Sequence, residues 1–245
     1  MKPKSNSIFH FTKNLEILKA ILKGGFWPRY CLEDMLLLTE NLHDFVAFPM
    51  VCFCDIPLSR IDEHIGFYGK FGIGMTRKWA EQNGLNPILY ASGSNNLTKE
   101  LLALNGHINK LEKSLQQDAK ITTRYIYGHV KPTTGMMVVA GAPVSKDFYQ
   151  ECEWRFIPQH PEITSYLRRD EFNDEAKLEE ENAKTLKLSL VKFEPSDVKY
   201  IFVEKDSDIP AIMNFIQAEL DGHTASALKI LSSRILSLES FGGDL

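Results

Sequence analysis

The sequence predicts an α+β fold in which helices are inserted between the strands of a curved sheet, mixed or antiparallel. Short apolar patterns of strand length are scattered along the chain and alternate with amphipathic helical patterns. The segment HFTKNL, residues 10–15, follows the first predicted strand and lacks the glycine-rich turn of a parallel nucleotide-binding βαβ unit. A doubly wound parallel sheet is therefore disfavoured.

The N-terminal half predicts a strand, a helix and then shorter elements. The run Ile8–Phe11 is typical of a strand, and leucines recur at helical spacing from Leu15 until Gly24 and Gly25 end the helix. The elements expected after it are an aromatic turn and short helix over 26–38, a strand over 51–56, a helix to residue 68, a glycine-rich strand over 69–76, a helix from 76 or 77, a strand over 88–92 and one long helix over 96–125.

The C-terminal half mixes irregular segments with late strands. Residues 128–150 are expected to be irregular, and the acidic run 168–185 to be a solvated loop or an exposed helix. The remaining elements are expected to be strands over 151–158, 186–193 and 199–205 and helices over 208–220 and 224–241. We expect residues 1–205 to form one domain and residues 206–245 to form a helical extension packed on it.

Composition excludes several classes of protein. The chain has 245 residues and a net charge of −4, which argues against a broad non-specific grip on nucleic acid but leaves a local basic groove open. It has no stretch of about 20 uncharged apolar residues and no signal-peptide core, so we expect a cytoplasmic protein without a membrane partner. The four cysteines fit neither a disulfide framework nor a zinc site, and we expect buried thiols and no metal.

Three places combine polar residues with strand ends. The first is the pair His10 and Thr12. The sequence leaves two roles open for His10, a structural one and a ligand-binding one. The second is the glycine-rich stretch 68–75, in which the backbone can pass close to a ligand or to a second strand. It does not match a phosphate-binding P-loop.

The third place is the pair Glu151 and Glu153 in the stretch ECEWR. On a strand, both carboxylates and Arg155 point to one face, opposite Cys152 and Trp154. A surface strand can carry such a pair for solubility. Like charges about 7 Å apart repel, however, so the pair is easier to explain if a cationic group visits, such as an oxocarbenium-like transition state.

Two of these motifs resemble a known enzyme class. His10-x-Thr12 followed by NLEILKAILKGG resembles the first segment of ADP-ribosyltransferases, and ECEWR resembles their glutamate-x-glutamate element. The run PMVCFCDIPLSRIDEHIGFYGKFGIGMTRKWAEQNGLNP, residues 49–87, more closely resembles the AbiGi family of bacterial abortive phage-infection proteins. AbiGi-like proteins are similar to DarT-type toxins, which modify nucleic acid. The resemblance implies an ADP-ribosyltransferase-like fold and a mono-ADP-ribosyltransferase toxin of an anti-phage system that uses NAD.

The same resemblance implies roles for four residues in binding NAD. His10 would bond the hydroxyls of the adenosine ribose, and Thr12 would assist it. Tyr68 would stack on nicotinamide. Arg77, at a predicted helix start, would meet the pyrophosphate with the help of the helix dipole.

Catalysis is assigned to the two glutamates by the same resemblance. Glu153 would accept a hydrogen bond from the 2′-hydroxyl of the nicotinamide ribose and stabilise positive charge as the glycosidic bond breaks. Glu151 would orient or deprotonate the acceptor. The acceptor is expected to be a nucleic acid, with RNA favoured over DNA or protein. The aromatic and basic residues that would hold an unpaired base are Trp27, Arg29, Tyr30, Arg124, Tyr125 and Lys131.

The alternative hypothesis is a catalytically silent antitoxin or sensor in an abortive-infection pair, because the AbiGi family is described as the antitoxin half of such a pair. The acidic segment 170–182 and the terminal helix 224–241 would then be partner surfaces. Under the enzyme hypothesis the same terminal helix either packs on its own domain or binds a cognate antitoxin or chaperone. Toxicity distinguishes the two, since a toxin arrests growth when produced alone.

Overall fold

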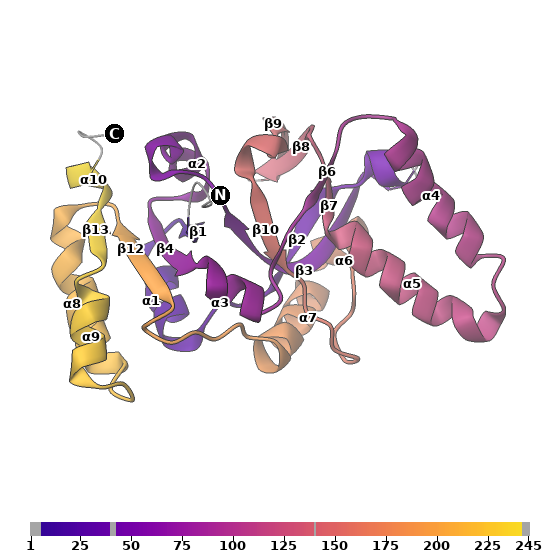
Figure 1. The fold of residues 1–245 in the computed structure, drawn as a ribbon. Coiled ribbons are helices and arrows are strands. Elements are labelled where there is room, and N and C mark those ends of the chain that lie inside the picture. The colour runs from indigo at the N-terminus through magenta and orange to yellow at the C-terminus, as the bar shows by residue number, and fades with distance from the viewer. Residues whose placement is uncertain (1–5, 40–42, 140, 242–245) are drawn as a thin grey trace. The chain divides into compact units, whose positions relative to one another are not determined.

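A computed structural model describes residues 6–39, 43–139 and 141–241. Figure 1 shows the helices and strands of the chain. The chain divides into two compact units. Unit 1 comprises residues 1–26, 52–86 and 190–245, and unit 2 comprises residues 27–51 and 87–189. Helices and strands alternate along both, so the expected α+β class with a mixed sheet is confirmed.

Unit 1 is built on a mixed sheet. Its strands follow the order β13–β12–β4–β1–β3, in which only β12 and β13 are parallel. In the centre, β1 pairs with β4 in a register that sets His10 opposite Ile73 and Thr12 opposite Phe71. The strands are β1 (Ser7–Thr12), the last three residues of β3 (Phe45–Cys54), β4 (Phe71–Thr76), β12 (Val198–Val203) and β13 (Ile235–Ser237).

The helices of unit 1 begin at side-chain caps that the sequence supplies. Asn14 caps the first helix by accepting from Ile17 N, and Thr76 caps α3 by accepting from Trp79 N. An ion pair of 2.6 Å joins Lys23 of α1 to Glu219 of α8. The helices are α1 (Leu15–Gly24), α2 (Asp62–Tyr68), α3 (Arg77–Gln82), α8 (Ile209–Glu219), α9 (Ala225–Ser232), α10 (Leu238–Phe241) and the short 3-10 turns η2 (Leu58–Arg60) and η4 (Asp206–Asp208).

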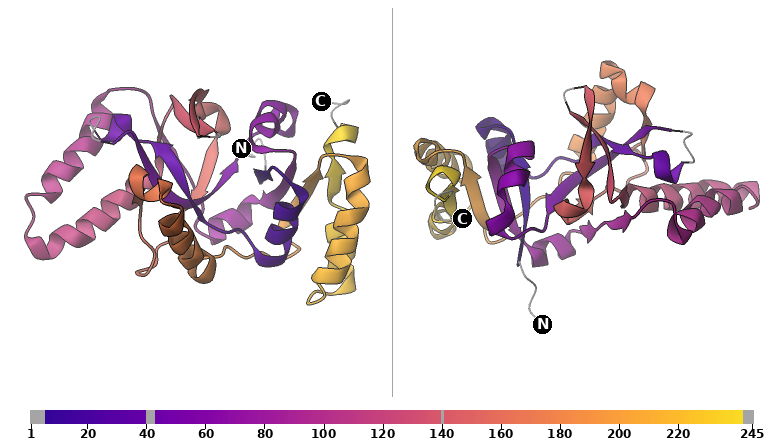
Figure 2. Two further views of the ribbon diagram at one scale, coloured as in Figure 1. Left: turned by 180° about the vertical axis from the view of Figure 1, so that it is seen from behind. Right: turned by 90° about the horizontal axis from the view of Figure 1, so that it is seen from above.

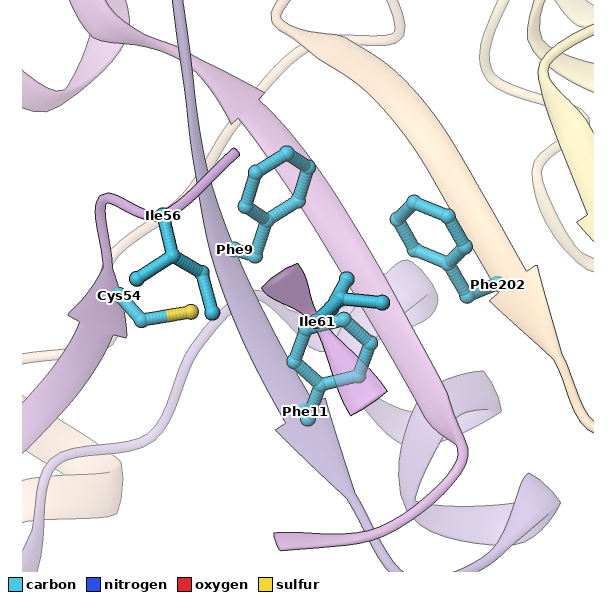
Figure 3. Close-up of a cluster of buried hydrophobic side chains, with 6 residues drawn as sticks. All are labelled: Phe9, Phe11, Cys54, Ile56, Ile61 and Phe202. Carbon is cyan, nitrogen blue, oxygen red and sulfur yellow. The ribbon is translucent and has the colours of Figure 1, made fainter. Parts of the chain in front are cut away.

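A cluster of buried apolar side chains lies against the sheet of unit 1 (Figure 3). Phe9 and Phe11 from β1 meet Phe202 from β12, with ring centroids 5.9 and 5.6 Å apart. Cys54, Ile56 and Ile61 complete the cluster. Burying these side chains contributes to the stability of the unit.

The glycines of the stretch 68–75 let strands approach closely. A Cβ on Gly72 would lie 2.6 Å from the Phe11 ring, and one on Gly74 would lie 2.9 Å from the Tyr200 ring. Between the two interpretations that the sequence left open, this geometry favours close packing against neighbouring strands.

Unit 2 contains shorter strands. The first part of β3 pairs antiparallel with β2 and with β11, while β6 and β7 pair parallel and β8 and β9 pair antiparallel. The strands are β2 (Arg29–Asp34), β6 (Leu89–Ala91), β7 (Val130–Pro132), β8 (Thr134–Val139), β9 (Ala142–Asp147), β10 (Glu153–Phe156) and β11 (Leu167–Arg168); β5 (Asn86–Pro87) lies at the junction of the two units in the chain.

Two helical pairs belong to unit 2. Helices α4 and α5 lie side by side and antiparallel (Figures 1 and 2), and the Tyr127 hydroxyl donates to the carbonyl of Leu101 at 2.6 Å between them. Helix α7 packs on β2, and Thr185 is fully buried there. The helices are α4 (Asn96–Ile108), α5 (Lys113–Gly128), α6 (Arg169–Asn173), α7 (Glu175–Leu188) and the 3-10 turns η1 (Leu36–Leu38) and η3 (Phe148–Glu151).

Long-range pairing corrects several strand expectations. Residues 29–34 form a strand because they pair with β3, although their sequence favours a turn and a short helix. The stretch 128–150, expected to be irregular, contains β7, β8 and β9. The strand expected over 186–193 is wrong, because α7 continues to Leu188 and only Val191 forms an isolated bridge, with Phe26.

Two of the expected helices are interrupted in the structure. The long helix expected over 96–125 is two helices, separated by residues 109–112 rather than at Gly106. The terminal helix expected over 224–241 is interrupted by β13, which gains backbone partners from β12. The acidic run forms α6 and α7, and Glu181 within it is buried between Lys177 and Lys184.

The expected division into residues 1–205 and 206–245 stays a prediction. All four cysteines are reduced; Cys31 and Cys152 are exposed, so the expectation of buried thiols is wrong for these two. Over the residues that the structure describes, every helix is too short or too polar to cross a membrane.

Candidate functional site

The glutamate pair lies in unit 2, where η3 leads into β10. Glu151 is the last residue of η3 and Glu153 is the first of β10, so only Glu153 lies on the expected strand. Cys152 between them has φ +45°, a left-handed conformation that is uncommon outside glycine. This turn replaces strand alternation as the reason that both carboxylates face the same way.

The cation between the two carboxylates is Lys131. Its ammonium group is 2.9 Å from Glu151 Oε2 and 2.9 Å from Glu153 Oε2. Lys131 comes from β7, and its Nζ also lies 4.3 Å from the centroid of the Phe148 ring. The sequence predicted that a cation visits this pair; in the structure the chain itself supplies one.

Arg155 completes the arrangement around Glu153. Its Nε donates to Glu153 Oε1 at 2.6 Å, and its Nη2 donates to Glu33 Oε2 at 2.6 Å. Its Nη1 donates to the carbonyl of Gly128 at 2.7 Å. The expectation that Arg155 shares a face with Glu153 is confirmed.

We call Glu33, Lys131, Lys146, Glu151, Glu153 and Arg155 the buried ion cluster. Lys146 from β9 contributes the last bond, 2.6 Å to Glu151 Oε1. Three carboxylates and three cations therefore balance. Glu151 is 5% exposed, Glu153 4% and Arg155 0%, so water does little to screen these charges.

The cluster changes the acidity of its own members. Burial raises the pKa of the Glu151 carboxyl, but Lys131 and Lys146 outweigh it and hold that pKa below its ordinary value. Burial lowers the pKa of the Lys131 ammonium, and Glu153, Glu33 and Glu151 more than reverse this, so that pKa is raised. Both groups stay charged at neutral pH.

All four carboxylate oxygens of the glutamate pair are bonded to cations of the chain. Glu153 uses Oε1 for Arg155 and Oε2 for Lys131, while Glu151 uses Oε1 for Lys146 and Oε2 for Lys131. A carboxylate that accepts a bond from a ribose hydroxyl needs an oxygen exposed to the substrate. In this arrangement the pair forms part of a buried structural network.

The other predicted residues lie in unit 1. His10 is on β1, and its ring packs against Phe26 and Phe53 at centroid distances of 5.3 and 5.5 Å. Its Nδ1 donates to the carbonyl of Cys52 at 2.8 Å, which requires the proton on Nδ1 because a carbonyl only accepts. Burial lowers the pKa of His10, although the bond to Cys52 partly opposes this. His10 is therefore a neutral side chain built into the sheet.

Thr12, Tyr68 and Arg77 have different surroundings in the same unit. Thr12 is buried at the end of β1. Tyr68, the last residue of α2, lies 4.5 Å from the ring of His64 and packs on the apolar cluster of Figure 3. Arg77 is the first residue of α3, and its Nη2 donates to Asp55 Oδ2 at 2.7 Å. Their roles in binding NAD stay predictions, as do the catalytic roles of the two glutamates.

The state of His10 predicts a pH effect on stability. Because its pKa is lower in the folded chain than the ordinary 6.5, the unfolded chain binds the proton more readily. We expect the contribution of His10 to the free energy of unfolding to be fully present above about pH 6.5. The free energy of unfolding should fall as the pH drops from there toward the pKa of His10 in the folded chain. Urea unfolding at a series of pH values between 8 and 5 measures this slope.

Two variants test whether His10 causes this pH dependence. His10→Asn keeps an N–H donor for Cys52 and removes the titration, so its slope should be shallower than that of the wild type. His107→Asn, at an exposed position on α4, should leave the slope unchanged. Equal slopes for His10→Asn and the wild type would contradict the assignment to His10.

Two residues expected to hold a nucleic-acid base are unsuitable. Lys131 is enclosed in the buried ion cluster, and Tyr30 is buried with its hydroxyl donating to the carbonyl of Thr164. Trp27 is held by α7, because its Nε1 donates to Thr185 Oγ1 at 2.9 Å. The roles of Trp27, Arg29, Arg124 and Tyr125 in holding a base stay predictions.

Unit 2 also has an open groove of about 640 Å³. Arg169 lies on its wall, paired with Asp44 and 5.2 Å from the centroid of the Phe45 ring. Neither Glu151 nor Glu153 lines it. The charges of the groove compensate one another in ion pairs, and no sequence pattern predicted the groove.

Comparisons with known proteins identify the family. A family model described as "Putative abortive phage resistance protein AbiGi, antitoxin" matches residues 25–204, more than half of the chain. The chain belongs to the AbiGi family. A protein of Lactococcus lactis subsp. cremoris named "Abortive phage resistance protein AbiGi" is 29% identical over 249 residues, covering 90% of this chain and 99% of that protein. No solved structure matches the AbiGi chain.

The match confirms the AbiGi resemblance that residues 49–87 carried. It includes Tyr68, Arg77 and the whole buried ion cluster, and it begins after His10 and Thr12. Sequence reasoning missed Lys131 and Lys146 as partners of the glutamates, and Glu33 as a partner of Arg155. The one available signal was the need for a cation near two adjacent carboxylates, which does not say where in the chain the cation lies.

Proposed function

We propose that this AbiGi chain is the antitoxin member of an abortive phage-infection pair and that it acts without catalysis. The observation that carries the proposal is the buried ion cluster, in which every carboxylate oxygen of the glutamate pair is bonded to a cation of the chain. The description of the matching family as an antitoxin supports the same conclusion.

The chemistry of the cluster supports a structural role for the glutamates. To act on NAD, Glu153 would have to give up Lys131 or Arg155 while both stay buried. An uncompensated buried charge costs about 3–5 kcal/mol, and nothing in the cluster offsets that loss. A catalytic carboxylate is instead preorganised toward its substrate.

The transferase hypothesis remains the second proposal, with its ADP-ribosyltransferase-like fold, NAD as substrate and a nucleic-acid acceptor, RNA favoured. Its support is the order along the chain of His10-x-Thr12, the glycine-rich aromatic segment and Glu151-x-Glu153. A cytoplasmic location is proposed for either function.

Growth assays separate the two proposals. Produced alone in a bacterial host, the AbiGi chain should leave growth unchanged, and labelled NAD should leave no label on RNA, DNA or protein. Produced with its cognate toxin, defined as the product of a neighbouring gene that arrests growth by itself, the chain should restore growth. Both results follow if the chain neutralises the toxin and does not modify RNA, DNA or protein.

Growth arrest by the chain alone, with label transferred from NAD to one of the three fractions, would overturn the antitoxin proposal. His10→Asn is the matched variant for that result, because it keeps the bond to Cys52 and alters the proposed contact with ribose. Under the transferase proposal it should lose the label. Failure of the chain to neutralise the toxin would also contradict the antitoxin proposal.

A further inference from the structure

The end of α5 in unit 2 holds a titratable side chain that neither proposed function uses. His129 follows the last residue of α5, and β7 begins at the next residue. The His129 ring packs on the Tyr125 ring, with centroids 4.6 Å apart. Arg124, the neighbouring cation on α5, places its guanidinium 4.8 Å from the centroid of the Tyr166 ring. We call residues 125–131 the α5–β7 junction.

Only one nitrogen of the His129 ring has a hydrogen-bond partner among the described residues. Nδ1 lies 2.9 Å from the carbonyl oxygen of Tyr125. Because a carbonyl only accepts, Nδ1 carries a proton and donates it. Nε2 is buried and has no partner in the described part of the chain. A buried nitrogen without a partner costs free energy, and the cost is greater when that nitrogen carries a charged N–H.

A second proton, on Nε2, would place a positive charge beside the buried ion cluster. Two charged groups act on the His129 ring, Arg155 and Glu153, and both come from β10. Arg155 repels the charge from a fixed position, because its Nη1 donates to the carbonyl of Gly128 at 2.7 Å. Glu153 attracts the charge, but its Oε1 is bonded to Arg155 and its Oε2 to Lys131. A protonated Nε2 would have to compete with these two cations for a carboxylate oxygen.

The other elements that contact the junction bring further titratable groups. Lys131 of β7 is a cation of the buried ion cluster, and Tyr90 of β6 pairs with it in the parallel ladder. Helix α4 packs on α5, and its Lys99 and Glu100 are exposed, so water screens their charges. The dipole of α5 favours a cation at this end of the helix, but only weakly. These groups do not compensate a buried charge on His129.

We propose that the α5–β7 junction is a pH-sensitive switch: neutral His129 keeps the junction closed, and protonation of Nε2 expels the ring and opens the junction. The proposal goes beyond both proposed functions and depends on neither. Expulsion breaks the bond to the Tyr125 carbonyl and loosens the Gly128 carbonyl that holds Arg155. Opening therefore reaches the buried ion cluster.

The sign of the pH dependence follows from burial. Burial lowers the pKa of His129 in the folded chain, and the bond to the Tyr125 carbonyl only partly opposes this. An open junction exposes the ring, so its pKa returns toward the ordinary 6.5 and it binds the proton more readily. The closed junction should be fully favoured above about pH 6.5 and should lose stability as the pH falls toward the pKa of His129 in the folded chain.

Hydrogen–deuterium exchange of the full chain, read by mass spectrometry on peptides that cover residues 124–132, tests the switch. Protection factors corrected for the intrinsic exchange rate should fall by about threefold or more between pH 7.5 and pH 5.5 in the wild type. His129→Asn keeps an N–H donor for the Tyr125 carbonyl and cannot be protonated, so this fall should be absent. His107→Asn, at an exposed position on α4, should behave as the wild type does.

Peptides from β1, residues 7–12, separate the switch from the titration of His10 in unit 1. Their protection should change equally in the wild type and in His129→Asn, and residues 124–132 of His129→Asn should change no more than they do. His129→Gln, which also cannot be protonated, replaces His129→Asn if the shorter side chain prevents folding. Unchanged protection of residues 124–132 in the wild type would overturn the switch without any variant. An equal fall in the wild type and in the variant would also overturn it, because another group would then be responsible.

Discussion

Replacing Lys131 by methionine is expected to lower the free energy of unfolding by about 3–5 kcal/mol. The substitution keeps an apolar stem of similar length but leaves Glu151 Oε2 and Glu153 Oε2 without the ammonium group that lies 2.9 Å from each. Both carboxylates stay buried, and their repulsion is no longer compensated. Urea unfolding followed by tryptophan fluorescence measures the loss, since Trp154 lies on β10 between Glu153 and Arg155.

Two further variants show whether charge balance is the cause. The Lys146 side chain is 17% exposed, against 7% for Lys131, so water compensates more of its loss and Lys146→Met should cost less than Lys131→Met. Adding Glu151→Gln to Lys131→Met removes one negative charge for the positive charge lost. The double variant should then be more stable than Lys131→Met alone. Unchanged stability of Lys131→Met would show that the cluster is not what holds this part of unit 2 together.

The sequence predicted those parts of the fold whose cause is local. The strand around His10, the helix capped by Asn14 and the helix capped by Thr76 follow from alternation, spacing and caps within a few residues. Strand β2 was missed because its stability comes from pairing with β3, and β13 because its partner β12 lies more than 30 residues earlier.

The candidate site also has a part with a local cause, which the sequence predicted, and a part that depends on residues far apart in the chain. That Arg155 faces Glu153 follows from alternation along β10, so the sequence predicted it. Lys131 and Glu33 are separated from Glu153 by 22 and 120 positions in the printed chain. Only the folded chain brings Lys131 to the Glu153 carboxylate and Glu33 to the Arg155 guanidinium. The sequence therefore implied a missing cation and attributed it to a substrate, whereas the chain provides it.

Replacing Gly69 by alanine is expected to destabilise unit 1 by about 3 kcal/mol, near the upper end of what backbone strain costs. Gly69 has φ +121°, a conformation that alanine rarely adopts, and a Cβ there would lie 2.2 Å from the carbonyl oxygen of Thr12. Thr12 ends β1 and pairs with Phe71 at the start of β4. The new methyl group must therefore push apart the two central strands of the sheet.

Gly66, three positions earlier, is the matched control. It lies inside α2, and a Cβ there would have no neighbouring atom within 4 Å. Gly66→Ala should leave the urea midpoint unchanged or raise it, because alanine is favoured over glycine in a helix by up to about 1 kcal/mol. If Gly69→Ala proved as stable as Gly66→Ala, the close contact between β1 and the turn before β4 could not be what sets the register of His10 and Thr12. A large loss confined to Gly69→Ala would mean that the glycine-rich stretch is required for packing, whether or not a ligand also binds beside it.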